Sequence, residues 1–426
     1  MAIDNKDKKV LKSSIEREQN EVACSAECEK IKGSKNLNVP HLRFPEFSGE
    51  WKKCKLGDLC NVLMCKRILV SQTNTEDGVP FYKIGTIGST PDAYISKELF
   101  DDYKVKYNYP RKGEVMITCA GTVGKCVVYD GEDAYFQDSN IVWIDNPTQY
   151  ISNGFLFHLL SKVDWRKLNS TTIIRIYNDD LRNLKMSYPR KEEQQKISHL
   201  LSLLDERIAT QNKIIEKLQS LIKGLNDNIH KGIKGETVCF SDLGEAYSGL
   251  SGKGGDDFGY GEPFITYMNV YQNTYISEKD YELVQIAPNE KQNSVQYGDA
   301  LFTLSSETPE EVGIGAVYLG NTQKLYLNSF CFGIHFYDER VLPQYLAHFI
   351  SSSSFRRAIY PLAQGSTRFN LQKNDFMKMK FLLPSLEKQG HIANTLDALH
   401  CRLANEKSLT EQYILLKKYL LSLMFI

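Results

Sequence analysis

Two stretches of the sequence decide the fold, because one is a copy of the other. The first, YPRKEEQQKISHLLSLLDERI, covers residues 188–208, and the second, LPSLEKQGHIANTLDALHCRL, covers residues 383–403. They align without a gap, and the matched positions are Pro189 with Pro384, Glu192 with Glu387, Gln194 with Gln389, Ile197 with Ile392, Leu201 with Leu396 and Leu204 with Leu399. Such a repeat indicates that the chain contains two related structural units.

The repeat extends upstream of both stretches. NSTTIIRIYNDDLRNLKMSYP, from Asn169, aligns in the same register with GSTRFNLQKNDFMKMKFLLP, from Gly365. With insertions, GVPFYKIGTIG (78–88) parallels GEPFITYMNVY (261–271), and residues 112–131 parallel residues 297–320. Segments such as EVMIT, NIVWI, ALFTL and FCFGIHF are short, β-branched or aromatic, and bounded by turn residues, so they predict strands.

The segment after each strand-rich half has a different period. In the first copy, apolar residues recur alternately four and three positions apart, which is the spacing of a coiled-coil seam. The seam positions are Ile197, Leu201, Leu204, Ile208, Gln211, Ile215, Leu218, Ile222, Leu225 and Ile229. Pro189 precedes this predicted helix, and Gly232 and Gly235 end it. A stripe of this length requires a partner helix.

The second helical copy begins in the same way, with Ile392, Leu396, Leu399 and Leu403. Further along, the same register contains the polar residues Glu406, Thr410 and Lys417. A shifted seam, which resembles a stutter, is formed by Leu409, Tyr413, Leu416, Leu420 and Leu423. We expect the two helices to pair antiparallel with each other as a spacer.

These patterns predict an α+β fold in which two similar strand-rich domains are joined by long, antiparallel, coiled-coil-like spacer helices with pseudo-two-fold symmetry. The expected boundaries are an extension that is partly helical or disordered (1–39), a first domain (40–190), a central spacer helix (191–232), a second domain (233–384) and a distal spacer helix (385–426).

Composition and motifs exclude several functions. The 426 residues contain no apolar run long enough to span a bilayer and no apolar signal core, so a cytoplasmic protein without a membrane partner is expected. The ten cysteines include no Cys-x-x-Cys pair, which argues against a metal site. Neither an Asn/Asp-Pro-Pro-aromatic motif nor a glycine-rich cofactor loop is present, and the eight histidines are isolated, so no catalytic site is predicted.

The net charge of zero does not favour a solitary DNA-binding protein. Residues 236–384 contain 11 basic and 17 acidic side chains, so the second half is mildly acidic. Binding to DNA would therefore depend on local basic patches or on basic partner subunits.

Five stretches of the sequence nevertheless resemble parts of one known family. RFPEFSGEWKKCKLGDL, from Arg43, is similar to the opening of the specificity subunits of Type I restriction–modification enzymes. GVPFYKIGTIG and AGTVGK (120–125) resemble a strand and a glycine turn of their target-recognition domains, and the two copies quoted first resemble their spacer regions. The resemblance extends from about Pro40 to the last residue.

The resemblance implies a DNA-sequence-specificity subunit without catalytic activity. Two target-recognition domains would each read one part of a split, asymmetric site on double-stranded DNA. The spacer helices would set the gap and dock two modification (adenine methyltransferase) subunits, which would bind S-adenosylmethionine, so no cofactor is expected in this chain. Restriction (motor-nuclease) subunits would join for cleavage.

Candidate DNA contacts are polar or basic residues in expected loops and strand ends of the repeat, because such side chains reach base edges and phosphates. They are Lys66, Arg67, Lys83, Thr122, Lys125, Arg175 and Tyr177 in the first half, and Lys253, Tyr267, Asn269, Ser305, Ser306, Thr367 and Arg368 in the second. The predicted spacer and subunit interface comprises Ile197, Leu201, Leu204, Ile208, Ile215, Leu218, Ile222, Leu396, Leu399 and Leu403.

Two other functions stay open from the residues alone. One is a self-contained DNA-modifying enzyme, which the missing motifs disfavour. The other is a scaffold whose long helices bind proteins without DNA.

Overall fold

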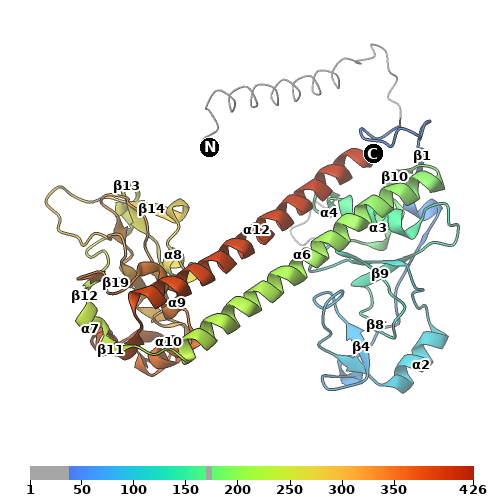
Figure 1. The fold of residues 1–426 in the computed structure, drawn as a ribbon. Coiled ribbons are helices and arrows are strands. Elements are labelled where there is room, and N and C mark those ends of the chain that lie inside the picture. Colours follow the sequence, from blue (N-terminus) through green and yellow to red (C-terminus); the bar gives the residue numbers. More distant parts are fainter. Residues whose placement is uncertain (1–37, 169–174) are drawn as a thin grey trace, which may run out of the picture. The chain divides into compact units, whose positions relative to one another are not determined.

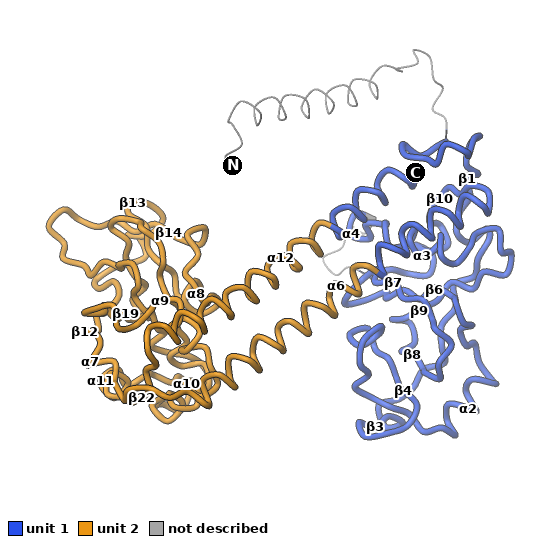
Figure 2. Tube along the Cα trace, viewed as in Figure 1, with its two compact units in different colours: residues 1–206, 413–426 blue, residues 207–412 orange. Residues whose placement is uncertain are grey.

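The computed structural model describes residues 38–168 and 175–426, and the chain divides into two compact units (Figure 2). Unit 1 comprises residues 1–206 and 413–426, and unit 2 comprises residues 207–412. Residues 1–37 of the predicted N-terminal extension lie outside the described part of the chain. Both units combine short strands with helices, which confirms the predicted α+β class with two strand-rich domains.

Unit 1 contains most elements of the first half of the chain (Figure 1). In order, they are β1 (Lys52–Lys55), β2 (Asn61–Leu63), β3 (Thr73–Asn74), β4 (Val79–Tyr82), β5 (Tyr94–Ile95), α2 (Lys97–Lys106), β6 (Val115–Thr118), β7 (Cys126–Val128), β8 (Tyr135–Phe136), β9 (Ile141–Asp145), α3 (Asn153–Lys162), α4 (Trp165–Leu168), α5 (Asn178–Arg182) and β10 (Lys185–Tyr188). Helix α6 (Lys191–Lys231) begins in unit 1 and continues into unit 2.

Unit 2 continues the series (Figure 1). Its elements are β11 (Glu236–Cys239), α7 (Phe240–Leu243), β12 (Gly244–Ser248), β13 (Phe258–Ile265), α8 (Tyr267–Gln272), β14 (Tyr281–Val284), β15 (Ala300–Thr303), β16 (Ser305–Ser306), β17 (Gly315–Val317), β18 (Tyr326–Leu327), β19 (Cys331–Phe336), α9 (Pro343–Ile350), α10 (Ser353–Ile359), β20 (Ala363–Gln364), β21 (Phe369–Leu371), α11 (Lys373–Met377) and β22 (Lys380–Leu383). Helix α12 (Leu386–Met424) returns the chain to unit 1.

The sheet topology repeats between the units. A four-stranded sheet has the order β2-β9-β6-β7 in unit 1 and β12-β19-β15-β17 in unit 2, and all its pairings are antiparallel. A parallel pairing also recurs, between β4 and β8 and between β13 and β18. The first and last strands of each half pair antiparallel, as β1-β10 and β11-β22. The sequence repeat therefore corresponds to a repeated structure.

Each unit encloses the end of a long helix in its core. In unit 1, Ile197 and Leu201 of α6 pack with Leu421, Met424 and Phe425 at the end of α12. The Phe425 ring lies 4.8 Å from the ring of Phe155 and 6.4 Å from that of Trp51, measured between centroids. In unit 2, Leu225 and Ile229 pack against a core that contains Ile392 and Leu396. Burying such a side chain fully contributes about 1.5–3 kcal/mol.

The predicted seam positions are buried to different degrees. The predicted positions Ile197, Leu201, Ile222, Leu396 and Leu403 are buried, and the others, Leu204, Ile208, Ile215, Leu218 and Leu399, are half-buried. Two helices alone leave one side of a seam open to solvent, which explains the partial burial.

The predicted shift of the seam in α12 is wrong. Leu416 of the shifted set is 44% exposed, whereas Glu406 and Thr410 of the original register are buried. The polar residues are tolerated because each has a partner. The Gln211 amide donates to the Glu406 carboxylate, and the Lys417 ammonium lies 2.5 Å from the Asp205 carboxylate. The register therefore continues without a stutter.

Candidate nucleic-acid interface

Three predicted contacts of unit 1 lie in two loops that are fastened together. Thr122 and Lys125 belong to the turn between β6 and β7, and Lys83 belongs to the loop after β4. Thr122 Oγ1 donates to the carbonyl oxygen of Ile84 (3.2 Å), and Lys125 Nζ donates to that of Ile87 (2.5 Å). Lys83 is half-buried and pairs with an aspartate of its own loop at 3.0 Å. Thr122 and Lys125 thus use hydrogen-bond donors to hold the two loops together.

A second group in unit 1 surrounds the loop between β8 and β9. Arg67 lies 4.0 Å from the carboxylate of Asp138, and Arg175 donates to the carbonyl oxygen of Ser139 (3.4 Å). The Arg175 guanidinium also lies over the ring of Tyr177, 5.9 Å from its centroid. Two predicted contacts from distant parts of the sequence, Arg67 and Arg175, therefore meet at one loop, and Tyr177 lies beside Arg175.

The backbone of this loop is strained. Ser139 has φ of +54°, which is the left-handed region that residues other than glycine rarely adopt. Such a conformation costs on the order of 1 kcal/mol or more and is commonly kept where function requires it. Tyr177, whose ring lies under the Arg175 guanidinium, is 61% exposed, as a side chain that stacks on a base would be.

Lys66 lies on a different aromatic ring, with its ammonium nitrogen 5.4 Å from the centroid of Tyr107. It has no described role beyond this contact, and its assignment to DNA stays a prediction.

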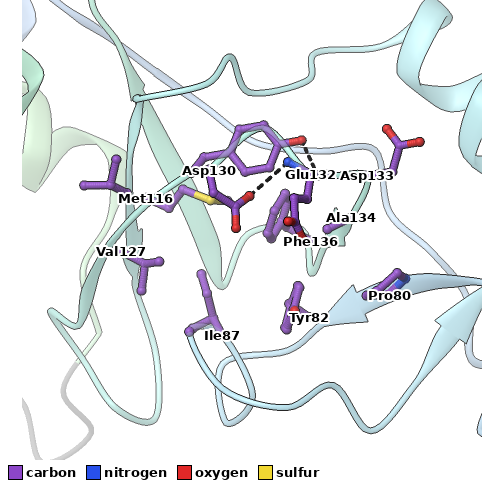
Figure 3. Close-up of a pocket in the computed structure, with 13 residues that line it drawn as sticks. Pro80, Tyr82, Ile87, Met116, Val127, Asp130, Glu132, Asp133, Ala134 and Phe136 are labelled. Carbon is purple, nitrogen blue, oxygen red and sulfur yellow. Dashed lines mark hydrogen bonds between the residues drawn. The ribbon is translucent and has the colours of Figure 1, made fainter. Parts of the chain in front are cut away.

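The cavity of unit 1 that is drawn in Figure 3 has the wrong charge for phosphate. Its volume is about 110 Å³, and its lining includes Asp130, Glu132 and Asp133 (Figure 3). Lys104 and Lys97 donate to Asp133 at 2.8 Å, which holds the pKa of this carboxyl group below its usual range. None of the predicted contacts lines this cavity.

Unit 2 brings four predicted contacts into one pocket of about 300 Å³, namely Tyr267, Ser305, Ser306 and Arg368. The Tyr267 hydroxyl donates to the carbonyl oxygen of Ser305 (2.9 Å), which connects α8 to β16. Strand β16 pairs with β21, with Ser306 opposite Phe369, so Arg368 lies directly before the first residue of β21. The pairing of two short strands therefore assembles this pocket, which we call the Arg368 pocket.

The other predicted contacts of unit 2 have different surroundings. Asn269 is buried, donates to the carbonyl oxygen of Ser277 (2.8 Å) and accepts from the amide nitrogen of that residue (2.9 Å), so it holds a loop. The Lys253 side chain is largely buried and pairs with Glu290 at 2.5 Å. Thr367 is exposed beside Arg368 in the turn after β20.

Chemistry on cysteine or metal is not supported by the described residues. The eight described cysteines are free thiols, and no cluster of three or more His, Cys, Asp or Glu side chains in ranges 38–168 and 175–426 could hold a metal ion. Burial raises the pKa of Cys60, Cys65, Cys119 and Cys126 to about 12, which keeps them protonated. Among these described residues, no helix is long and apolar enough to cross a membrane.

Large apolar side chains are exposed on both long helices. In unit 1 they are Leu203 of α6 and Ile414, Leu415, Leu416 and Tyr419 of α12, and in unit 2 they are Leu221 of α6 and Leu386 of α12. Exposed apolar positions in such a row are typical of surfaces that bind other proteins. Except for Leu416, which the shifted seam contained, sequence reasoning missed them because it searched for one apolar stripe on each helix.

Sequence reasoning also missed the aromatic support of Arg368. The guanidinium carbon lies 5.4 Å from the ring centroid of Phe330, which is 52% exposed in the loop before β19. Phe330 has no special neighbourhood in the sequence, so only the folded chain reveals the contact. The acidic members of the pocket, Glu307 and Glu311, were missed for the same reason.

Comparison with protein families explains the repeated architecture. A family model described as the Type I restriction modification DNA specificity domain matches residues 48–220 and again residues 235–412. The chain belongs to this specificity family. Both halves of the repeat are thus copies of one specificity domain, and the recognition made from the sequence motifs is confirmed.

Curated relatives of the specificity family agree. A Haemophilus influenzae protein named as a type I restriction enzyme specificity subunit is 48% identical over 172 residues, which are 40% of this chain and 44% of that protein. The MjaX specificity subunit of Methanocaldococcus jannaschii is 22% identical over 92% of this chain and 96% of its own length. The first match spans less than half of its relative, whereas the second is nearly complete.

Two solved structures show a similar fold. The Type I restriction–modification S subunit of M. genitalium has a TM-score of 0.54 at 14% identity, and the match covers 91% of this chain and 99% of that chain. A chain from a study of complex assembly and conformational transition of the type I restriction–modification system has a TM-score of 0.55 at 15% identity, covering 90% and 98%.

Proposed function

We propose that this member of the specificity family is the DNA-reading subunit of a Type I restriction–modification complex. Each unit would read one part of a bipartite, asymmetric site on double-stranded DNA. The observation that carries the proposal is that both specificity domains gather predicted contacts at one place, around Ser139 in unit 1 and in the Arg368 pocket in unit 2.

The same two places share a chemical feature. Each presents an arginine that lies over an aromatic ring, Arg175 over Tyr177 and Arg368 over Phe330. A stacked guanidinium keeps its planar set of donors in a restricted orientation, which favours directional hydrogen bonds over general charge attraction. This supports base reading more than phosphate binding.

We infer that the long helices set the unread gap and dock the partner subunits. Helix α6 has 41 residues and α12 has 39, which corresponds to about 60 Å of helix. Half-sites on one face of DNA are about 34 Å apart for each helical turn, so the spacer length would select the gap. Inserting one heptad in each helix should lengthen the unread gap and leave the bases read unchanged.

The exposed apolar residues of these helices support two modification subunits as partners, with restriction subunits joining for cleavage. The chain would act without catalysis or a cofactor of its own, and S-adenosylmethionine would be bound by the modification subunits in the cytoplasm. Isothermal titration of the isolated chain with S-adenosylmethionine tests whether the cofactor is bound only by the modification subunits. Tight binding to the isolated chain would contradict this assignment.

The central experiment is a map of methylated DNA from cells that express the chain with its modification subunit. A split motif, containing two specified parts and an unread gap, is expected. Methylation without a gap, or binding to the partner with no protection of any split site in footprints, would contradict DNA reading by two units.

A further inference from the structure

The turn that carries Arg368 is fixed by its backbone. Strands β20 and β21 form a hairpin in which Gln364 lies opposite Asn370. Gly365 has φ of +144°, and a Cβ atom at this position would lie 2.0 Å from the carbonyl oxygen of Arg368. Only glycine fits position 365, because any side chain there would collide with the backbone of Arg368. Arg368 is therefore presented by a rigid element.

The side chain of Arg368 is also restricted. Its guanidinium carbon lies 5.4 Å from the ring centroid of Phe330, within the distance of a cation–π contact. The loop of Phe330 is held in turn, because the Phe330 amide donates to Asn328 Oδ1 (2.9 Å). An exposed arginine supported in this way loses less conformational entropy when it donates hydrogen bonds.

The remainder of the Arg368 pocket disfavours phosphate. Its lining includes the carboxylates of Glu307 and Glu311. The Tyr271 hydroxyl donates to Glu311 at 2.8 Å and the Ser306 hydroxyl at 3.2 Å, which holds the pKa of Glu311 below its usual range and keeps it charged. Two negative groups next to one arginine repel a phosphate, whereas they are compatible with an uncharged base edge.

The polar groups of the pocket are not all used within the unit. Ser305 is 5% exposed, lines the pocket, and its Oγ has no hydrogen-bond partner among the described residues. A buried hydroxyl without a partner costs free energy, which a ligand with polar groups can recover. Exposed Met268 and Phe330 add apolar surface that suits the flat side of a base.

We propose that the Arg368 pocket reads a G·C base pair, with Arg368 donating to O6 and N7 of guanine and Phe330 acting as the positioning residue. Guanine is the base that offers two adjacent acceptors in the major groove, which matches the two parallel donors of a guanidinium. The inference rests on the proposed function, since it names the base that unit 2 reads.

The experiment compares methylated motifs in cells that express the full chain with its modification subunit. For Arg368→Ala, one guanine of the motif should become degenerate while every other position is retained. Discrimination at that position should fall about ten- to hundred-fold, in line with the loss of one bidentate contact. Phe330→Leu should keep the same motif with a smaller loss at the same guanine.

Arg357→Ala is the matched control, because Arg357 is exposed on α10 of the same unit and does not line the pocket. It should leave the motif unchanged. A motif that is unchanged in Arg368→Ala would overturn the inference but leave the proposed function intact. Absence of any split motif with the unmodified chain would instead refute the proposed function.

If Arg368→Ala removes all methylation, binding of the assembled complex to duplexes substituted at single base pairs decides the matter. A loss confined to duplexes that carry the guanine supports base reading. An equal loss on all duplexes, together with a salt dependence reduced by about one phosphate contact, would show that Arg368 binds the backbone and would overturn the inference. Thermal unfolding of each variant checks that unit 2 remains folded.

Discussion

Gln194 and Gln389 occupy the same position in the two units and make the same set of hydrogen bonds. Both side chains are fully buried near the start of a long helix. Gln194 accepts from the Ser152 amide (2.7 Å) and donates to the carbonyl oxygens of Tyr150 and Pro189 (2.9 Å each). Gln389 accepts from the Leu342 amide (2.7 Å) and donates to the equivalent carbonyl oxygens, of Arg340 and Pro384 (2.9 Å each). One amide thus joins each helix to its strand-rich domain.

Replacing either glutamine should destabilise its own unit. We expect Gln194→Ala and Gln389→Ala each to lower the free energy of unfolding by about 2–4 kcal/mol, because three buried backbone groups lose their partner. Chemical denaturation measures the effect. The exposed neighbours Gln195→Ala and Lys388→Ala serve as controls and should change stability by less than about 0.5 kcal/mol. A loss as small as that of the controls would contradict the role of the buried amides.

The pair Gln211 and Glu406 should fix the register of the helices rather than stabilise them. Glu406→Leu alone leaves the buried amide without its partner and should cost about 1–3 kcal/mol. The double variant, with Gln211→Leu as well, should recover most of that stability, and it should bind the modification subunit less selectively because a uniform seam permits other registers. A double-mutant cycle in denaturant provides the coupling energy. Additive losses would argue against the pair.

Acid should weaken unit 1 through His158. Burial, assisted by repulsion from Lys417, lowers the pKa of His158 to about 4 from 6.5, so the unfolded chain takes up the proton first. Stability is therefore complete above pH 6.5 and declines as the pH falls toward 4, by about 2 kcal/mol between pH 7 and pH 5. The free energy of unfolding, measured at several pH values, should depend less on pH for His158→Gln than for the exposed control His391→Gln. Identical slopes for the two variants would refute this origin.

Charge on the exposed apolar row of α12 should prevent assembly. Leu415→Glu and Tyr419→Glu, at side chains that are 63% and 61% exposed, should reduce copurification of the modification subunit at least ten-fold while thermal unfolding changes little. Lys418→Glu, on an exposed side chain between them in the sequence, controls for charge alone. Undiminished copurification of both variants would exclude this row as the docking surface.

Position 365, in the turn before Arg368, should tolerate no side chain. We expect Gly365→Ala to cost more than about 2 kcal/mol, because a Cβ atom would collide with the carbonyl oxygen of Arg368. Gly252 also has positive φ, at +69°, but has open space around its Cβ position. Gly252→Ala should therefore cost only about 1 kcal/mol of backbone strain. Equal costs in thermal unfolding would mean that the turn can relax.

The sequence predicts much of the fold because its two strongest signals are local or repeated. The gapless repeat alone places Gln194 and Gln389 at matching positions. The alternate spacing of apolar residues, four and three positions apart, predicts the paired helices. Local spacing misjudged the polar seam residues of α12, since the burial of Glu406 depends on Gln211, which lies in the other helix.

The candidate site was predictable only in its residue types. The choice of arginine, serine and tyrosine in expected loops was useful, because four of the seven predicted DNA contacts of unit 2 line one pocket. Asn269 and Lys253 have the same chemistry, yet the fold uses them for internal bonds. Which polar residue remains available depends on contacts such as that of Arg368 with Phe330, and no pattern in the sequence contains these.

Unit 1 is assembled from two segments that are far apart in the sequence, since residues 413–426 complete a core that includes Trp51. Unit 2 is continuous from residue 207 to residue 412. During synthesis, the core of unit 1 can therefore be completed only after Phe425 has emerged from the ribosome. All residues of unit 2 are available earlier. Completion of unit 1 thus depends on residues translated after all of unit 2, and loss of residues 413–426 would open the core of the unit that is translated first.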